Sequence, residues 1–203
     1  MSGSTFVPVS GGNVNIQDIT PAGDTIDEGD VNIQILDAYG RTTAAYVYYG
    51  ADMFDDGYPA GWYDDDGIAN ATFATGTGLW VAAPDANTTL TFSGKVPTED
   101  VTVVLRAGFT PTANMMPTDV AIQDILPAGS SIDEGDVNIQ ILDAYGRTTA
   151  AYVYYGEDMF DDGYPAGWYD DDGLVDVTFP GGTGLWVSAT DSETTITFPA
   201  PEL

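Results

Sequence analysis

The sequence contains no histidine and no cysteine, and only four of its 203 residues are lysine or arginine. These absences exclude a Ser-His-Asp triad, a Cys-His nucleophile, a zinc site built from His and Cys, and any disulfide. A single lysine, Lys95, leaves little room for Schiff-base chemistry. Neither Asp-Thr-Gly nor Asp-Ser-Gly occurs, so the turn of an aspartic protease is also missing. We therefore expect no enzymatic activity.

The charge is almost entirely of one sign: 32 acidic residues give a net charge of −28. Such a field repels nucleic acid and anionic membranes, so neither is an expected direct partner. No apolar run approaches the length of a membrane span, and the first residues lack the basic and apolar regions of a secretory signal. We expect a soluble chain without a signal peptide that works outside the cell, on a virion or at a cell surface.

An internal duplication organises the chain. Residues 26–67 and 132–173 are related by an offset of 106 and differ at one position, Ala51 against Glu157. The similarity continues on both sides, for example between residues 88–92 and 194–198. We divide the chain into repeat 1 (residues 1–93), a connecting strand segment (94–108) and repeat 2 (109–203). Each repeat has the length of one small β domain.

The pattern within each repeat predicts an all-β fold, two tandem β-sandwich-like domains. Val31, Ile33 and Ile35 alternate with polar residues, as in a half-buried strand. Further aromatic and β-branched strands are expected at 46–49, 79–83 and 88–92, with Gly, Pro and Asp turns between them. No segment has helical periodicity. Short strands with frequent turns are typical of a sandwich or small barrel.

The joint between the repeats contains an extra strand, expected over residues 101–105. Repeat 1 has no counterpart before Phe6, and repeat 2 has none at its end. If each repeat requires this strand, one of them has an unpaired edge, and unpaired edges invite strand addition from a neighbouring chain. The alternative is a linker strand that completes one domain and leaves nothing open.

Two short motifs resemble a β-rich domain of bacterial surface proteins. Residues 108–117 open with Gly-Phe and end with Asn-Met-Met-Pro, and residues 182–187 read Gly-Thr-Gly-Leu-Trp-Val. Repeat 1 departs from this pattern, because residues 6–12 lack the Asn-x-x-Pro step. The resemblance implies an extracellular structural or adhesive module, with no catalytic residues to transfer.

An acidic loop at residues 52–67 recurs at 158–173 and is the candidate metal site. Carboxylates and carbonyl oxygens are the ligands that Ca²⁺ prefers, although the EF-hand spacing is absent. The alternative is a pair of solvated Asp-Gly turns. The candidate calcium ligands are Asp55, Asp56, Asp64, Asp65 and Asp66 in repeat 1, and Asp161, Asp162, Asp170, Asp171 and Asp172 in repeat 2.

The candidate contacts between copies of the chain are apolar, aromatic and basic. They are Val101, Val103 and Leu105 of the joint strand, Tyr58, Trp62, Tyr164 and Trp168 of the acidic loops, and Arg41 and Arg147. The alternatives for the aromatic residues are a position in the core of the sandwich, which the pattern favours, and a platform for a glycan. Each arginine follows an aspartate by four residues, Asp37 or Asp143, and is expected to bridge it and order the turn. A clamp between subunits is the alternative.

Together these features predict a non-enzymatic structural protein that assembles with itself. The assembly would be a virion component, such as a decoration, tube or fibre protein, or a cell-surface filament. Edge strands and aromatic side chains would form the contacts, and Ca²⁺ or salt would offset the charge. The alternative is a monomeric, calcium-dependent module for glycan binding and adhesion.

Overall fold

Strands form nearly all the regular structure in the computed structural model of the chain. The structure describes residues 3–9, 12–23, 26, 28–50, 59–83, 88–92, 97–129, 132, 135–156 and 165–201. Within these ranges the only helices are two 3-10 helices of three residues each. The all-β prediction is confirmed. None of the described helices is long and apolar enough to cross a membrane.

Repeat 1 contains short strands joined by turns. In chain order they are β1 (Gly3–Pro8), β2 (Val14–Asn15), the 3-10 helix η1 (Ile16–Asp18), β3 (Thr20–Ala22), β4 (Glu28–Leu36), β5 (Thr42–Tyr49), β6 (Gly61–Asp64), β7 (Gly67–Ile68), β8 (Thr72–Phe73), β9 (Gly78–Ala83) and β10 (Thr89–Thr91). The expected strands at 46–49, 79–83 and 88–92 lie in or overlap β5, β9 and β10.

The rest of the chain follows the same order after one additional strand. The elements are β11 (Val101–Val104), β12 (Gly108–Ala113), β13 (Val120–Ala121), the 3-10 helix η2 (Ile122–Asp124), β14 (Leu126–Ala128), β15 (Val137–Leu142), β16 (Thr148–Tyr155), β17 (Gly167–Asp170), β18 (Gly173–Leu174), β19 (Thr178–Phe179), β20 (Gly184–Ala189) and β21 (Thr195–Phe198). The connecting strand predicted at 101–105 is therefore present as β11.

Each repeat contains a six-stranded antiparallel sheet with the same strand order. The order is β1-β9-β4-β5-β6-β7 in repeat 1 and β12-β20-β15-β16-β17-β18 in repeat 2. Two smaller sheets accompany each: β10-β3 and β2-β8 in repeat 1, and β11-β21-β14 and β13-β19 in repeat 2. The sheet that contains the last strand of each repeat therefore has two strands in repeat 1 and three in repeat 2.

Each repeat has its own apolar core. The alternation in β4 places Val31 and Ile33 entirely inside, and Val137 and Ile139 of β15 repeat this arrangement. Side chains on one face of a strand recur every second residue, so this spacing turns one face of each six-stranded sheet toward its core.

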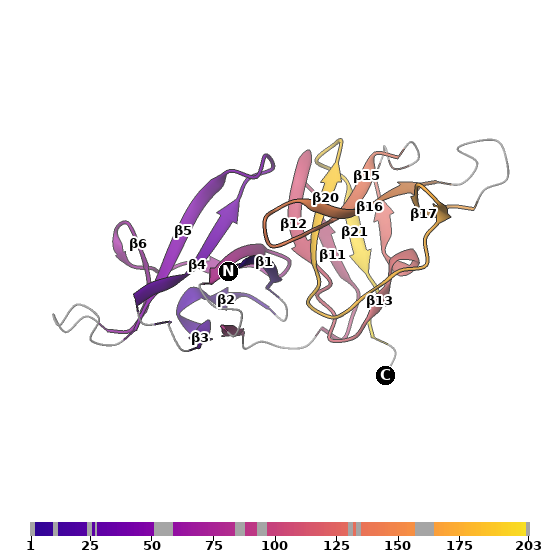
Figure 1. Ribbon diagram of the computed structural model, residues 1–203. Coiled ribbons are helices and arrows are strands. Elements are labelled where there is room, and N and C mark those ends of the chain that lie inside the picture. Colours follow the sequence, from indigo (N-terminus) through magenta and orange to yellow (C-terminus); the bar gives the residue numbers. More distant parts are fainter. Residues whose placement is uncertain are drawn as a thin grey trace.

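The two repeats lie side by side and contact each other through the β1–β9 and β12–β20 edges (Figure 1). The backbone N–H of Phe109 donates to the carbonyl of Ala38 over 3.1 Å. A Cβ at Gly78 would lie 2.6 Å from the Pro111 backbone, so only glycine permits this approach. The domain boundaries at residues 93 and 108 remain predictions.

Candidate functional site

The connecting strand β11 belongs to the sheet of repeat 2. It pairs antiparallel with β21, with Val101 opposite Phe198 and Val103 opposite Ile196. The N–H of Leu105 extends the ladder with a 2.8 Å hydrogen bond to the Thr194 carbonyl. In chain order β11 follows β10 directly, yet its partner is the last strand of repeat 2.

This pairing seals the end of the repeat 2 core. Val103 and Leu105 are buried, and Val101 packs against the same core from a partly buried position. On the adjacent strand β21, Ile196 and Phe198 have 0% exposure. The three residues of the connecting segment that were predicted as contacts between copies, Val101, Val103 and Leu105, therefore already pack against the core of repeat 2.

The equivalent edge in repeat 1 has a different environment. β10 pairs with β3, and no other described strand lies beside it. Leu90 and Phe92, which correspond to Ile196 and Phe198 at the offset of 106, are only partly buried. We call this side of β10 the open edge of repeat 1. Repeat 2 has the strand β11 at this position, and no described residues of repeat 1 form an equivalent strand.

Both predicted tryptophan contacts lie inside their own repeats. Trp62 and Trp168 are fully buried, and the indole N–H of each donates over 2.8 Å to the carbonyl of Ile19 or Ile125. Each ring meets a tyrosine edge-on, with centroids 5.4 Å apart. Of the alternatives for these rings, the structure supports the core position. Tyr58 and Tyr164 lie outside the described residues.

Two glutamines without a predicted role hold these tryptophans in place. The Gln17 side-chain amide donates to the carbonyls of Trp62 and Ala69, both over 2.8 Å, and its oxygen accepts from the Trp62 N–H. Gln123 makes the same contacts in repeat 2. The only sequence signal was the recurrence of Gln-Asp-Ile in both repeats.

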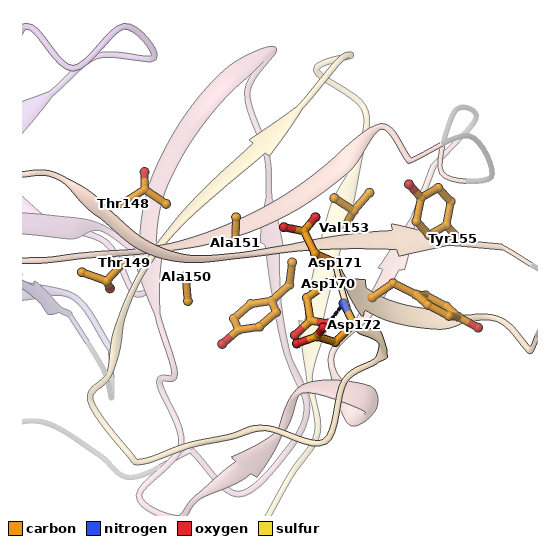
Figure 2. Close-up of a pocket in the computed structure, with 11 residues that line it drawn as sticks. Thr148, Thr149, Ala150, Ala151, Val153, Tyr155, Asp170, Asp171 and Asp172 are labelled. Carbon is orange, nitrogen blue, oxygen red and sulfur yellow. Dashed lines mark hydrogen bonds between the residues drawn. The ribbon is translucent and has the colours of Figure 1, made fainter.

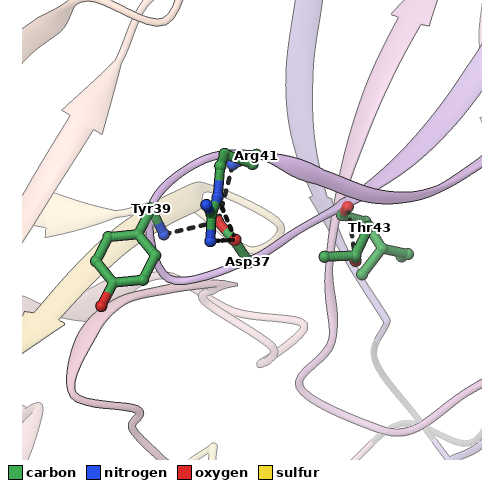
Figure 3. Close-up of polar contacts among 5 residues, drawn as sticks. Asp37, Tyr39, Arg41 and Thr43 are labelled. Atoms are coloured by element: carbon green, nitrogen blue, oxygen red, sulfur yellow. Dashed lines mark hydrogen bonds and ion pairs between the residues drawn. The ribbon is translucent and has the colours of Figure 1, made fainter.

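The arginine turns form as predicted (Figure 3). The Arg41 Nε–H donates to Asp37 Oδ2 over 2.7 Å, and the N–H groups of Tyr39 and Arg41 donate to Oδ1 over 2.8 and 2.9 Å. The Arg41 amide and guanidinium hold the pKa of the Asp37 carboxyl below its ordinary value. The guanidinium also lies 5.1 Å from the Tyr39 ring centroid. The expected bridge is confirmed, and the clamp between subunits stays a prediction.

Repeat 2 builds the same turn from Asp143 and Arg147. The Arg147 Nε–H donates to Asp143 Oδ2 over 2.7 Å, and Arg147 lowers the pKa of that carboxyl. The two turns differ in their surroundings: a Cβ at Gly40 would lie 3.7 Å from Trp186 of repeat 2, whereas a Cβ at Gly146 would meet nothing within 4 Å.

The described carboxylates of the acidic loops face solvent as turn residues. The N–H of Asp66 donates to Asp64 Oδ1 over 3.0 Å, and that of Asp172 donates to Asp170 Oδ1 over 2.9 Å. Among the described residues, no three acidic side chains are grouped closely enough to hold a metal ion. Four of the other proposed ligands lie outside the described residues: Asp55, Asp56, Asp161 and Asp162. Calcium binding stays a prediction, as does any role for Asp65 and Asp171.

A groove of about 570 Å³ runs along β16 beside the second acidic loop. Figure 2 shows Thr148 and Thr149 toward one end, Tyr155 toward the other and the carboxylates of Asp170, Asp171 and Asp172 between them. Burial raises the pKa of the Tyr152 hydroxyl in this groove, and the Asp170 carboxylate raises it further. The groove is therefore lined by tyrosines and by carboxylate oxygens that can accept hydrogen bonds.

No family model, curated protein or solved structure matches the chain. The resemblance to a surface-protein domain stays a prediction for that reason.

Proposed function

We propose that this protein is a non-enzymatic structural protein whose copies join through β-strand edges into a repeated extracellular assembly. The observation that carries the proposal is the open edge of repeat 1. The same position in repeat 2 is covered by β11, and the covering strand takes the exposure of Ile196 and Phe198 to 0%. A strand from another copy would do the same for Leu90 and Phe92.

The energetics of strand addition favour association at this edge. Each backbone hydrogen bond of the added ladder contributes about 1 kcal/mol net. Covering the partly buried Leu90 and Phe92 adds about 25 cal/mol for each Å² of apolar surface removed from water. An uncovered strand edge presents unpaired N–H and C=O groups, which are a template for pairing with a strand of another chain.

Charge opposes association and makes it sensitive to ions. Each copy has a net charge of −28, so close approach of two copies is repulsive in dilute buffer. Salt at about 0.15 M reduces the range of this repulsion to about 8 Å. Divalent cations would act more strongly if the acidic loops bind them. We expect assembly to be promoted by high salt and by millimolar calcium.

The chain lacks the residues of the Ser-His-Asp and Cys-His mechanisms, which is consistent with a structural role. The complete sequence has no histidine or cysteine. A virion decoration, tube or fibre protein and a cell-surface filament are the assemblies that fit an acidic all-β chain with an open edge.

Sedimentation velocity over a concentration series, with negative-stain microscopy of the same samples, tests the proposal. The buffers are low salt with EDTA, high salt with EDTA, and millimolar calcium. We expect monomers in the first buffer and regular filaments, tubes or shells in at least one of the others. Monomers at high concentration in every buffer would refute self-assembly.

The groove along β16 favours one second candidate, a monomeric adhesion module that binds a glycan. Aromatic rings can stack against the C–H groups of a sugar, and carboxylates can accept hydrogen bonds from its hydroxyls. The groove is lined by Tyr155 and by three aspartates. A glycan array with the monomeric protein, with calcium and with EDTA, tests this candidate. Binding that a Tyr155→Ala variant loses would support it, and an array without binding would remove it.

A further inference from the structure

The open edge presents a defined set of backbone groups. In an antiparallel ladder, alternate residues of a strand direct their N–H and C=O groups to opposite neighbours. Leu90 lies opposite Pro21 of β3, and proline has no N–H to donate. The Leu90 backbone groups therefore point away from β3, toward the open edge. Ile196 stands opposite Pro127 in repeat 2 in the same way, with β11 on its other side.

The outer side of β11 presents the complementary set. The hydrogen bond from Leu105 N–H to Thr194 directs Leu105, Val103 and Val101 toward β21. The alternate residues, Thr102 and Val104, therefore direct their backbone groups outward. No other described strand pairs with that side of β11. Thr102 and Val104 line one wall of a groove of about 320 Å³, and residues 75–78 of repeat 1 line the other, so an added strand has to enter between them.

The side chain of Val104 is unusual for its position. It is 64% exposed, on a strand whose neighbouring residues Val103 and Leu105 are buried. Residues directly opposite each other in an antiparallel pair place their side chains on the same face of the sheet. A strand that adds to β10 through Thr102 and Val104 thus places Val104 on the face that carries Leu90 and Phe92.

We infer that the occupant of the open edge is β11 of a second copy, added antiparallel to β10 with Val104 against Leu90 or Phe92. The inference rests on the proposed function and names the segment that carries it out. The second copy keeps its own β11–β21 pairing. The result is a continuous sheet in the order β3-β10-β11-β21-β14, whose first two strands come from one chain and last three from the next.

The geometry of this sheet places the two cores that it joins on opposite faces. β10 and β21 run in the same direction on either side of β11, but their partners β3 and β14 lie on opposite flanks. The pair β3-β10 of one copy is therefore related to the pair β14-β21 of the next by a half-turn about the strand direction. As a result, the core of repeat 1 and the core of the second copy's repeat 2 lie on opposite faces of the sheet. The joining surfaces differ, because one is in repeat 1 and the other in repeat 2. Such heterologous contacts propagate into rings or open chains.

The competing arrangement is an exchange of β11 between copies. It gives no net increase in buried apolar surface. A β11 strand that left its own repeat 2 to cover Leu90 and Phe92 would expose Ile196 and Phe198 instead. Addition through the outer side covers the open edge of one copy and Val104 of the other, and it breaks no existing pairing.

A pair of matched lysine variants tests the inference. Val104 and Leu126 are both exposed apolar residues of the sheet β11-β21-β14, at 64% and 56%, but only Val104 lies on β11. Because a charged edge residue blocks strand addition, Val104→Lys should weaken association about tenfold or more, while Leu126→Lys should leave it unchanged. Sedimentation velocity under assembling conditions gives both values, and far-UV circular dichroism checks that each variant folds.

The outcomes separate the inference from the proposed function. If wild type does not assemble in any buffer, the proposed function fails. If wild type and Val104→Lys assemble equally, the chain polymerises through another surface and the inference alone is overturned.

Cysteine cross-linking tests the pairing itself, because the chain contains no native cysteine. Chains carrying Leu90→Cys or Phe92→Cys are mixed under oxidising conditions with chains carrying Val104→Cys, Val103→Cys or Leu126→Cys. We expect a disulfide-linked dimer with Val104→Cys and none with Leu126→Cys. A dimer with Val103→Cys instead would show strand exchange, since Val103 occupies the position opposite Ile196 within repeat 2, and would overturn addition through the outer side.

Discussion

The last strands of the two repeats, β10 and β21, have closely related sequences and different surroundings. Thr-Leu-Thr-Phe at residues 89–92 corresponds to Thr-Ile-Thr-Phe at 195–198. The first is partly buried, whereas the apolar residues of the second are fully buried. β11 pairs with β21, whereas no described strand pairs with the corresponding side of β10. The burial of an edge residue is thus set by the neighbouring strand more than by its own sequence.

The largest expected effect comes from truncating the two equivalent core residues in dilute protein. Ile196→Ala should lower the free energy of unfolding by about 3 kcal/mol, because it leaves a cavity in a closed core. Leu90→Ala should lower it by about half as much, because its side chain is already partly in water. Urea unfolding followed by tryptophan fluorescence measures both. Equal losses would mean that Leu90 is covered in the monomer.

A smaller loss of stability, equal in the two repeats, is expected from the two glutamines that make the same contacts in both. Gln17→Ala and Gln123→Ala each remove hydrogen bonds to the backbone beside a buried tryptophan, which should cost about 1–2 kcal/mol in either repeat. Gln140→Ala is the control, since it loses one exposed hydrogen bond from Thr148. Urea unfolding of the three variants makes the comparison. Unequal losses for Gln17 and Gln123 would show that the repeats differ in more than the edge strand.

The smallest effect is the pH dependence of the arginine turns. The pKa of Asp37 is lowered in the folded chain, so the turn stabilises the fold above the ordinary value of 3.8. That contribution is lost as pH falls through the lowered folded pKa. Arg41→Ala should therefore reduce stability at neutral pH and have progressively less effect in acid, and Arg147→Ala should do the same.

Titration by NMR checks the cause of this dependence. The Asp37 carboxyl should titrate below its ordinary range in the wild type and move upward in Arg41→Ala. An Asp37 pKa that does not change in the variant would contradict the role assigned to Arg41.

Local patterns in the sequence predicted much of the fold. The alternation at Val31, Ile33 and Ile35 indicated a strand because one face of β4 is buried, and the spacing of Asp37 and Arg41 indicated an ordered turn. These features depend on residues close together in the chain. The connecting strand was also predicted, together with the consequence that one repeat could be left with an unpaired edge.

Strand pairings and hydrogen bonds between residues far apart in the sequence were not predictable in the same way. β11 follows β10 directly, and the similar sequences of β10 and β21 give no reason to prefer one partner. The roles of Gln17 and Gln123 depend on backbone carbonyls 45 and 52 residues away. Trp62 and Trp168 were proposed as contacts between copies and are core residues. The exposure of Val104 follows only once the inward face of β11 is known.

Amide hydrogen exchange at Leu90 and Ile196 tests the central claim most directly, because both N–H groups point to the side where β11 lies in repeat 2. We expect the Ile196 N–H to be protected from exchange at every protein concentration. Leu90 should exchange rapidly in dilute protein and become protected under assembling conditions. Strong protection of Leu90 in the dilute monomer, or rapid exchange in the assembled protein, would contradict the account.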